Sequence, residues 1–390
     1  MSRPFVELSD ELIMLSDGVS SFVKEKILPE EAKLSPATRG LPPEVVSALS
    51  AQARKAGYWM FSAPREYGGC GLTRFEAVVI YEAACRHRFS LPTPGDGVFG
   101  HEPPLILYDA SPEQIEKYVR PAIANGWRTF TAVSEPSGGS DPARAIRTTA
   151  RRHGDKYVIN GSKLWTTNFE NAKYGVVYCR TADKSAGRAG ISALIVDLDT
   201  PGMTRTEVPV LRDHWTNAVT FEEVEVPAEN LVGNEGDGFA LAQRWFGLNR
   251  LKIAATSIGV AAESVRLATE WVQQRSTFGA LLSSRQAVQF AIADAIMQIE
   301  AARLLTWKAA WEVDRGAPAR TLVSAAKVYA SETAFKVVDS MMQLFGGMGM
   351  TLEMPFSHWL GGLRVARVVE GPSEVHRHVI AREALSRGVA

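Results

Sequence analysis

The chain has 390 residues, of which 46% are hydrophobic and 22% charged, so it can bury large cores and is not a disordered or fibrous protein. Its 43 Lys and Arg residues balance 43 Asp and Glu residues, which excludes a global positive field for nucleic acid or an anionic membrane. Three scattered cysteines, no signal-peptide pattern and no apolar run of ~18 residues predict a cytoplasmic protein without a membrane span.

The N-terminal third of the chain has the pattern of helices. Apolar side chains recur at helical spacing over residues 12–27, and Pro43 begins a second helix that ends before Gly57. Thr73 and Glu76 form a capping-box pattern ahead of an apolar run.

From about residue 128 the pattern changes to short segments rich in Val, Ile, Thr and Tyr. The predicted strands cover 128–134, 148–152, 157–160, 162–167, 174–180, 191–198, 205–210 and 218–226. Asn160-Gly161 is the sequence of a two-residue hairpin turn, so the third and fourth segments are predicted to form a hairpin. The spacing predicts a compact antiparallel β domain.

The last third is helical again. Predicted helices cover about 239–272, 286–314, 319–344 and 373–387, and helices of this length pack as an antiparallel bundle. The predicted fold class is α+β, mostly α. The predicted domains are an N-terminal helical domain (1–127), a middle antiparallel β domain (128–237) and a C-terminal helical bundle (238–390).

Two motifs lie in the predicted β domain. Thr131–Asp141 reads TAVSEPSGGSD, a strand followed by a turn whose backbone N–H groups and hydroxyls can bind an anion or a ring carbonyl. In KLWTTN, Trp165 can shield one face of a flat aromatic ligand. The alternative is an ordinary Ser/Gly turn and a core tryptophan.

Two further motifs follow long predicted helices. In QQRSTFG, Arg275 could pair with a phosphate through its planar guanidinium, or it could be a surface arginine at a helix end. In QLFGGMGM, the paired glycines either let a ligand approach the backbone or end the helix.

The motif VVEGPSEVHR places Glu370 in an apolar context before a Gly-Pro pair that ends regular structure. Burial of a carboxyl group there would raise its pKa and make it a better general base for a weak carbon acid. The alternative is that Glu370 caps the following helix.

The order and spacing of these motifs resemble the acyl-CoA dehydrogenase family over essentially the whole chain. The matching stretches are YGGCGLT, TAVSEPSGGSD, GDKYVINGSKLWTTN, VPAENLVGNEGDGF, QRSTFG, QLFGGMGM and VVEGPSEVHRHVIAREAL, and the EGPSEVH tail resembles a divergent branch. The resemblance implies an N-terminal helical domain, a middle β domain and a C-terminal four-helix bundle. It also implies FAD bound between the β domain and the bundle, in a homo-oligomer, tetramer or dimer, whose neighbouring subunit completes the site.

The resemblance also implies roles for individual residues. Those expected to bind FAD are Val133 and Ser134 (flavin ring), Trp165 and Thr167 (isoalloxazine), Arg275 with Phe278 (pyrophosphate, across the dimer), and Gln343, Gly346 and Gly347 (adenosine side). Ser140 and Arg250 are expected to bind the CoA portion of the substrate. Glu370 matches the catalytic base; some members carry the base just before the arginine, but here that residue is Asn249, which cannot take a proton.

The implied reaction is α,β-dehydrogenation of an acyl-CoA thioester. Glu370 would remove the α-proton while the β-hydride moves to flavin N5, and the electrons would pass to an electron-transfer flavoprotein. The alternatives are an oxidase, flavin monooxygenase or desulfinase on the same scaffold, or a non-enzymatic flavoprotein. Retention of Glu370 favours α-proton abstraction, and zero net charge disfavours a nucleic-acid-associated relative.

Overall fold

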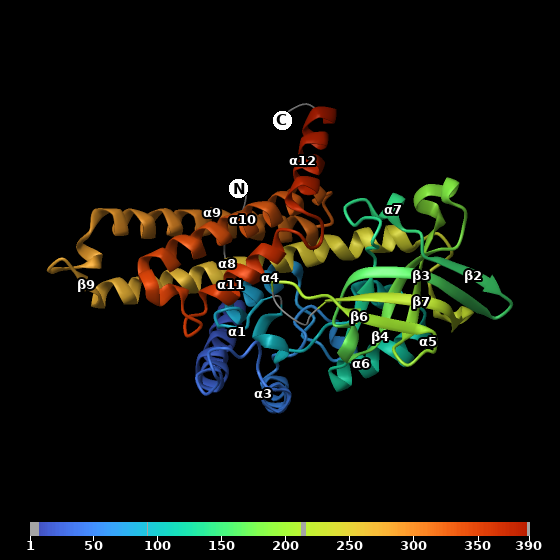
Figure 1. Cartoon of the computed structure of the whole chain (residues 1–390), viewed down its shortest axis with the longest axis horizontal. Helices are drawn as coiled ribbons and strands as arrows, with labels where there is room; N and C mark the ends of the chain where they lie inside the picture. Colours follow the sequence, from blue (N-terminus) through green and yellow to red (C-terminus); the bar gives the residue numbers. More distant parts are fainter. Residues whose placement is uncertain (1–7, 92, 212–215, 388–390) are drawn as a thin grey trace. The chain divides into compact units, whose positions relative to one another are not determined.

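The computed structural model describes residues 8–91, 93–211 and 216–387, and these fold into two compact units. The helical unit contains the described residues of 1–62, 70–99 and 247–390, and the sheet unit contains those of 63–69 and 100–246. The predicted fold class is confirmed: the chain is mostly helical with one large sheet (Figure 1). The three-domain boundaries stay a prediction. Residues 1–7, where no signal pattern was found, lie outside the described residues.

Helices form at the three predicted N-terminal positions, and the first of them continues to Glu31. They are α1 (Asp10–Phe22), a π-helical turn (Val23–Ile27), α2 (Leu28–Glu31), α3 (Pro43–Lys55) and α4 (Arg74–Ala84). The predicted capping box at α4 is present, with reciprocal hydrogen bonds between Thr73 and Glu76. Asp314 also caps α4, because its carboxylate accepts hydrogen bonds of 2.8 Å from the backbone N–H groups of Arg74 and Phe75.

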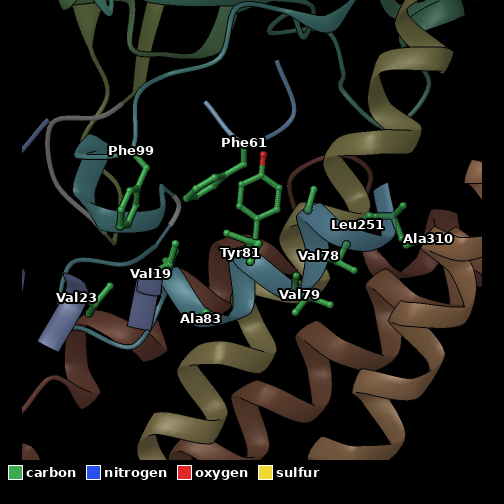
Figure 2. Packing of buried hydrophobic residues seen from close by; sticks show 14 of the residues in the cluster. Val19, Val23, Phe61, Val78, Val79, Tyr81, Ala83, Phe99, Leu251 and Ala310 are labelled. Atoms are coloured by element: carbon green, nitrogen blue, oxygen red, sulfur yellow. The ribbon is translucent and has the colours of Figure 1, made fainter. Parts of the chain in front are cut away.

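Helix α4 is the centre of the first core of the helical unit. All its residues from Ala77 to Ala84 are buried, as expected for a helix surrounded by protein on every face. Figure 2 shows Tyr81 of α4 next to Phe61, and their rings meet edge to face with centroids 5.8 Å apart. Leu251 and Ala310 belong to the same cluster, so this core joins the N-terminal helices to the C-terminal ones.

The C-terminal helices pack as the predicted bundle around α10. They are α8 (Gly238–Gln274), α9 (Gln286–Asp314), α10 (Arg320–Phe345), α11 (Phe356–Ala366) and α12 (Ser373–Arg387). The sequence did not predict α11, whose Gly361-Gly362 pair weakens the helical pattern. Gly362 allows close packing, since a Cβ there would lie 2.7 Å from Cβ of Leu91. No helix in the described ranges is both long and apolar enough to cross a bilayer.

The sheet unit contains one eight-stranded sheet in the order β6-β7-β3-β2-β4-β5-β8, with β1 paired to β4. The strands are β1 (Arg128–Ala132), β2 (Thr149–His153), β3 (Lys156–Thr167), β4 (Ala172–Arg180), β5 (Ile191–Asp197), β6 (Met203–Glu207), β7 (Thr216–Pro227) and β8 (Leu231–Val232). The unit also contains the short helices α5 (Pro112–Gln114), α6 (Arg120–Asn125) and α7 (Pro142–Ala145). Most neighbouring strands are antiparallel as predicted, but β1 and β2 pair with β4 in parallel.

The predicted hairpin at Asn160-Gly161 is wrong, because β3 continues through both residues. The Asn160 side chain forms a hydrogen-bonded pair with Glu223 of β7, which keeps the strand paired across a register shift. Gly161 does not form a turn; it allows β3 to pass close to Thr148. A Cβ at Gly161 would lie 2.6 Å from Oγ1 of Thr148. The Asn-Gly signal therefore marks a bulge.

Two glycines of α8 test the packing of the helical unit. A Cβ on Gly259 would lie 2.4 Å from the carbonyl oxygen of Glu82 in α4, whereas a Cβ on Gly247 would meet nothing within 4 Å. Gly259→Ala should lower the free energy of unfolding by about 1–3 kcal/mol, because α8 and α4 must move apart. Gly247→Ala should raise it by about 0.5–1 kcal/mol, the usual gain in a helix interior. Equilibrium urea unfolding measures both, and equal stabilities for the two variants would contradict this packing.

Candidate active site

Glu370 lies on the sharp turn that connects α11 to α12. Its φ is +56° and that of Gly371 is +97°, so two consecutive residues adopt left-handed conformations. Helix α11 ends at Ala366 and α12 begins at Ser373, so Gly371-Pro372 lies outside regular structure, as the sequence predicted. The backbone at Glu370 is therefore strained for a residue with a side chain.

Glu370 is half-buried as a residue, and its carboxyl group is the buried part. Its Oε2 is inaccessible and accepts no hydrogen bond from the described residues, while Oε1 lies 3.4 Å from Nδ2 of Asn249 in α8. Burial raises the pKa of Glu370 to about 7, against the opposing effects of Arg250, Asn249 and Lys327. A carboxyl with this pKa can accept a proton from a weak carbon acid near neutral pH. Because the carboxyl takes no hydrogen bond from α12 within the described chain, helix capping is not its role.

Three side chains contact the backbone of this turn. Nε of Arg250 donates to the Glu370 carbonyl oxygen at 3.0 Å, and Nε2 of His376 lies 3.1 Å from the same oxygen. Nζ of Lys327 donates to the Gly371 carbonyl oxygen at 2.8 Å. The predicted substrate contact Arg250 is thus next to Glu370. Neither Lys327 nor His376 was predicted as a site residue, although an isolated lysine among small apolar residues on α10 is a usable signal.

The first predicted cofactor segment lies at the end of β1 in the sheet unit. The carbonyl oxygen of Ser134 accepts a hydrogen bond of 2.9 Å from the backbone N–H of Leu164, so the segment adjoins β3 just before Trp165. Trp165 has a φ of +65° and is 54% exposed, so it is not a core tryptophan within this chain. Thr167 lies at the end of β3, and Ser140 is exposed in the loop before α7.

A buried ion pair supports the same segment. Nζ of Lys163 donates to Oε1 of Glu135 at 2.8 Å and to the carbonyl oxygen of Val133 at 3.1 Å. Burial alone would raise the pKa of Glu135, but the Lys163 ammonium and hydrogen bonds from Thr148 hold it below its ordinary value. Sequence reasoning missed this pair, because nothing local shows that a lysine in a strand points inward.

The other predicted cofactor residues gather at one end of the helical unit. Arg275 begins the hairpin β9 (Ser276–Thr277) and β10 (Ala280–Leu281), which connects α8 to α9 (Figure 1). Phe278 at its tip is 99% exposed with a φ of +51°. Gln343, Gly346 and Gly347 are exposed at the end of α10. The ring of Trp271 in α8 stacks on Phe345 of α10 at 4.9 Å, which brings the two motifs to the same end of the bundle.

Within the described ranges, no group of three or more His, Cys, Asp or Glu side chains is arranged to hold a metal ion. Cys85 and Cys179 are buried, and burial raises the pKa of the Cys179 thiol to about 12. The candidate chemistry therefore rests on the carboxyl group of Glu370 and on the surfaces that the cofactor motifs form.

Comparison with known proteins identifies the family. Models of the acyl-CoA dehydrogenase N-terminal, middle and C-terminal domains match residues 9–126, 131–224 and 236–385. The mitochondrial short-chain specific acyl-CoA dehydrogenase of Mus musculus is 33% identical, over 97% of this chain and 91% of its own length. The chain therefore belongs to the acyl-CoA dehydrogenase family, as the sequence predicted, and is an oxidoreductase of that type.

Two solved structures are similar throughout. Butyryl-CoA dehydrogenase from Megasphaera elsdenii has a TM-score of 0.86 and 28% identity, over 97% of this chain and 99% of its own. A chain from a structure of the electron transferring flavoprotein of Acidaminococcus fermentans has a TM-score of 0.87 and 31% identity, over 98% of this chain and 99% of its own.

The raised pKa of Glu370 makes the stability of the helical unit pH-dependent. The native state prefers the protonated carboxyl, so this contribution is complete below the unfolded pKa of 4.5 and is lost as pH rises through about 7. Glu370→Gln removes the buried charge and should raise the free energy of unfolding at pH 8.5 by up to about 3 kcal/mol. The gain should vanish near pH 4.

Urea unfolding of wild type and Glu370→Gln across this pH range measures the difference. Glu353→Gln, which changes an exposed carboxylate, serves as the matched control and should show no such pH-dependent gain. An equal effect of Glu370→Gln at both ends of the range would mean that the Glu370 carboxyl is not buried.

Proposed function

We propose that this protein catalyses FAD-dependent α,β-dehydrogenation of an acyl-CoA thioester, with Glu370 as the base for the α-proton. The observation that carries the proposal is the buried carboxyl of Glu370, whose pKa burial raises to about 7. Proton transfer from a weak acid is most effective when the base has a pKa near the working pH. Membership of a family that generally binds FAD, and similarity to a butyryl-CoA dehydrogenase, support the same reaction.

The residues present suit FAD. A flat ring system needs exposed aromatic surface, which Trp165 offers in the sheet unit and Phe278 offers at the hairpin tip. Beside Gly346 and Gly347 a Cβ would meet nothing within 4 Å, so a ligand can approach the backbone there. Val133, Ser134 and Thr167 would face the ring, and Arg275 and Gln343 the rest of the molecule. When bound, FAD would supply the acceptor for the two electrons and the β-hydrogen.

The side chains of this chain supply the acid–base chemistry. Glu370 would take the α-proton on its carboxylate, which Asn249 orients through Oε1. The backbone N–H of Glu370 makes no hydrogen bond within the described residues, so it is available to donate to the thioester carbonyl oxygen. Such a donor stabilises the negative charge that develops on that oxygen. Ser140 and Arg250 remain the proposed contacts to the CoA portion.

The reaction is tested by anaerobic addition of acyl-CoA thioesters of different chain length and branching to the FAD-loaded protein. At least one thioester should bleach the oxidised flavin, and Glu370→Gln should slow bleaching by on the order of 10²–10⁴-fold, the usual contribution of a general base. Glu353→Gln should bleach at the wild-type rate. Failure of every thioester would contradict the proposed reaction, and rapid bleaching by Glu370→Gln would contradict the assigned base.

The proposed partners are an electron-transfer flavoprotein and further copies of this chain. On α9, Phe290, Met297 and Leu304 are exposed and spaced by seven residues, so they form one apolar stripe opposite the buried face. A surface of this kind, together with the fully exposed Phe278, is typical of an interface between subunits. We therefore expect a homo-oligomer, a tetramer or a dimer.

Sedimentation velocity tests the oligomer. Met297→Glu places a charge in the apolar stripe and should shift the protein to a smaller species, because an unpaired charge is costly inside an interface. Gln52→Glu makes the same charge change at an exposed position on α3 and should leave the sedimentation coefficient unchanged. If Met297→Glu sediments as wild type does, the stripe is not part of the subunit interface.

A further inference from the structure

The peptide groups at Glu370 and Gly371 are held from the buried side by three different helices. Arg250 of α8 and His376 of α12 contact the Glu370 carbonyl oxygen. Lys327 of α10 contacts the carbonyl oxygen of Gly371. The side chains of Lys327 and His376 are completely buried, with 0% exposure each. Long or titratable side chains are seldom buried to this extent unless they have specific partners.

His376 acts here as a neutral donor. A carbonyl oxygen can only accept, so Nε2 of His376 carries the hydrogen in this contact. Burial, with the positive charges of Arg250 and Lys327, lowers the pKa of His376 to about 3. The imidazole is therefore uncharged across the working range of the protein, and it acts on Glu370 through geometry alone.

Lys327 acts through both geometry and charge. Its ammonium donates to the Gly371 carbonyl oxygen, and its positive charge lowers the pKa of Glu370. Burial in turn lowers the pKa of Lys327 to about 8. The groups that face the Glu370 carboxyl are Asn249 and Arg250 from α8 and Lys327 from α10, while His376 of α12 contacts the backbone.

We propose that Lys327 and His376 are positioning residues that clamp the left-handed turn, so that the carboxylate and backbone N–H of Glu370 stay free for substrate. A turn with two consecutive positive φ values, one of them at a residue with a side chain, does not hold itself. The clamp uses the two carbonyl oxygens and leaves the N–H of Glu370 without a hydrogen bond in the described chain. This inference rests on the proposed function, since positioning matters only if Glu370 is the base.

Substitution of Lys327 and substitution of His376 should change the rate and the pH midpoint of flavin bleaching differently. Lys327→Met keeps the side-chain volume but removes donor and charge, so it should slow anaerobic flavin bleaching by on the order of 10- to 100-fold and move the pH midpoint of bleaching upward. His376→Leu should slow bleaching by a similar factor without moving the midpoint upward, and His376→Gln, which keeps an N–H donor, should restore most of the rate. Lys336→Met, at an exposed position of the same helix, should match the wild type.

A second readout does not depend on turnover. Infrared titration of the full-length protein without substrate follows the carboxyl band that disappears in Glu370→Gln. The pH midpoint at which this band titrates should be higher in Lys327→Met than in wild type, and it should be unchanged in His376→Leu. If Lys327→Met does not fold, Lys327→Arg retains the charge but is longer, so it should slow bleaching without raising the midpoint.

The outcomes separate the clamp from the proposed function. If wild type bleaches, and Lys327→Met and His376→Leu both keep the wild-type rate and midpoint, the clamp is wrong. If none of the thioesters bleaches the flavin of the wild type, the proposed reaction fails. The pH midpoints of the infrared titration then decide alone whether Lys327 controls the charge of Glu370. An upward infrared shift in His376→Leu equal to that in Lys327→Met would contradict the neutral role of His376.

Discussion

The left-handed turn at Glu370 and Gly371 is the constraint on which the candidate chemistry depends. A non-glycine residue in this conformation is disfavoured by roughly 1–2 kcal/mol, and no regular helix or strand holds the peptide groups here. Donors from α8, α10 and α12 satisfy the two carbonyl oxygens, so the turn forms only when all three helices are packed. The position of one carboxyl group is thus set by the helical bundle as a whole.

Local sequence signals were sufficient for most of the fold. Apolar spacing located the long helices, and the capping box at Thr73 formed as predicted because both partners lie within one turn. The Asn160-Gly161 signal failed because the same dipeptide suits a bulge, and only the contacts to Glu223 and Thr148 distinguish the two. Helix α11 was missed because its paired glycines weaken the helical pattern, and Gly362 packs against Leu91, which lies far away in the sequence.

The candidate site was predictable in part. The apolar neighbours and the Gly-Pro pair indicated a buried carboxyl at Glu370, and the structure places it so. The donor His376 could not be found this way, because its role follows from the packing of α12 beside the turn. For Lys327 the sequence offers only the weaker signal of an isolated lysine among small apolar residues. The Glu135–Lys163 pair is similar: each residue looks ordinary in its own segment, and only the fold buries them together. The roles of the cofactor residues stay predictions from the resemblance.

The cap that Asp314 forms on α4 has a consequence for biosynthesis. The N-terminal helices leave the ribosome first, yet the core they share includes Leu251, Ala310 and Ala326, and the carboxylate that caps α4 follows much later. The sheet unit, by contrast, is almost continuous in sequence and can close on itself during translation. The nascent chain therefore carries an apolar α4 without its cap and packing partners for most of its synthesis, and transiently exposed apolar surface of this kind favours aggregation.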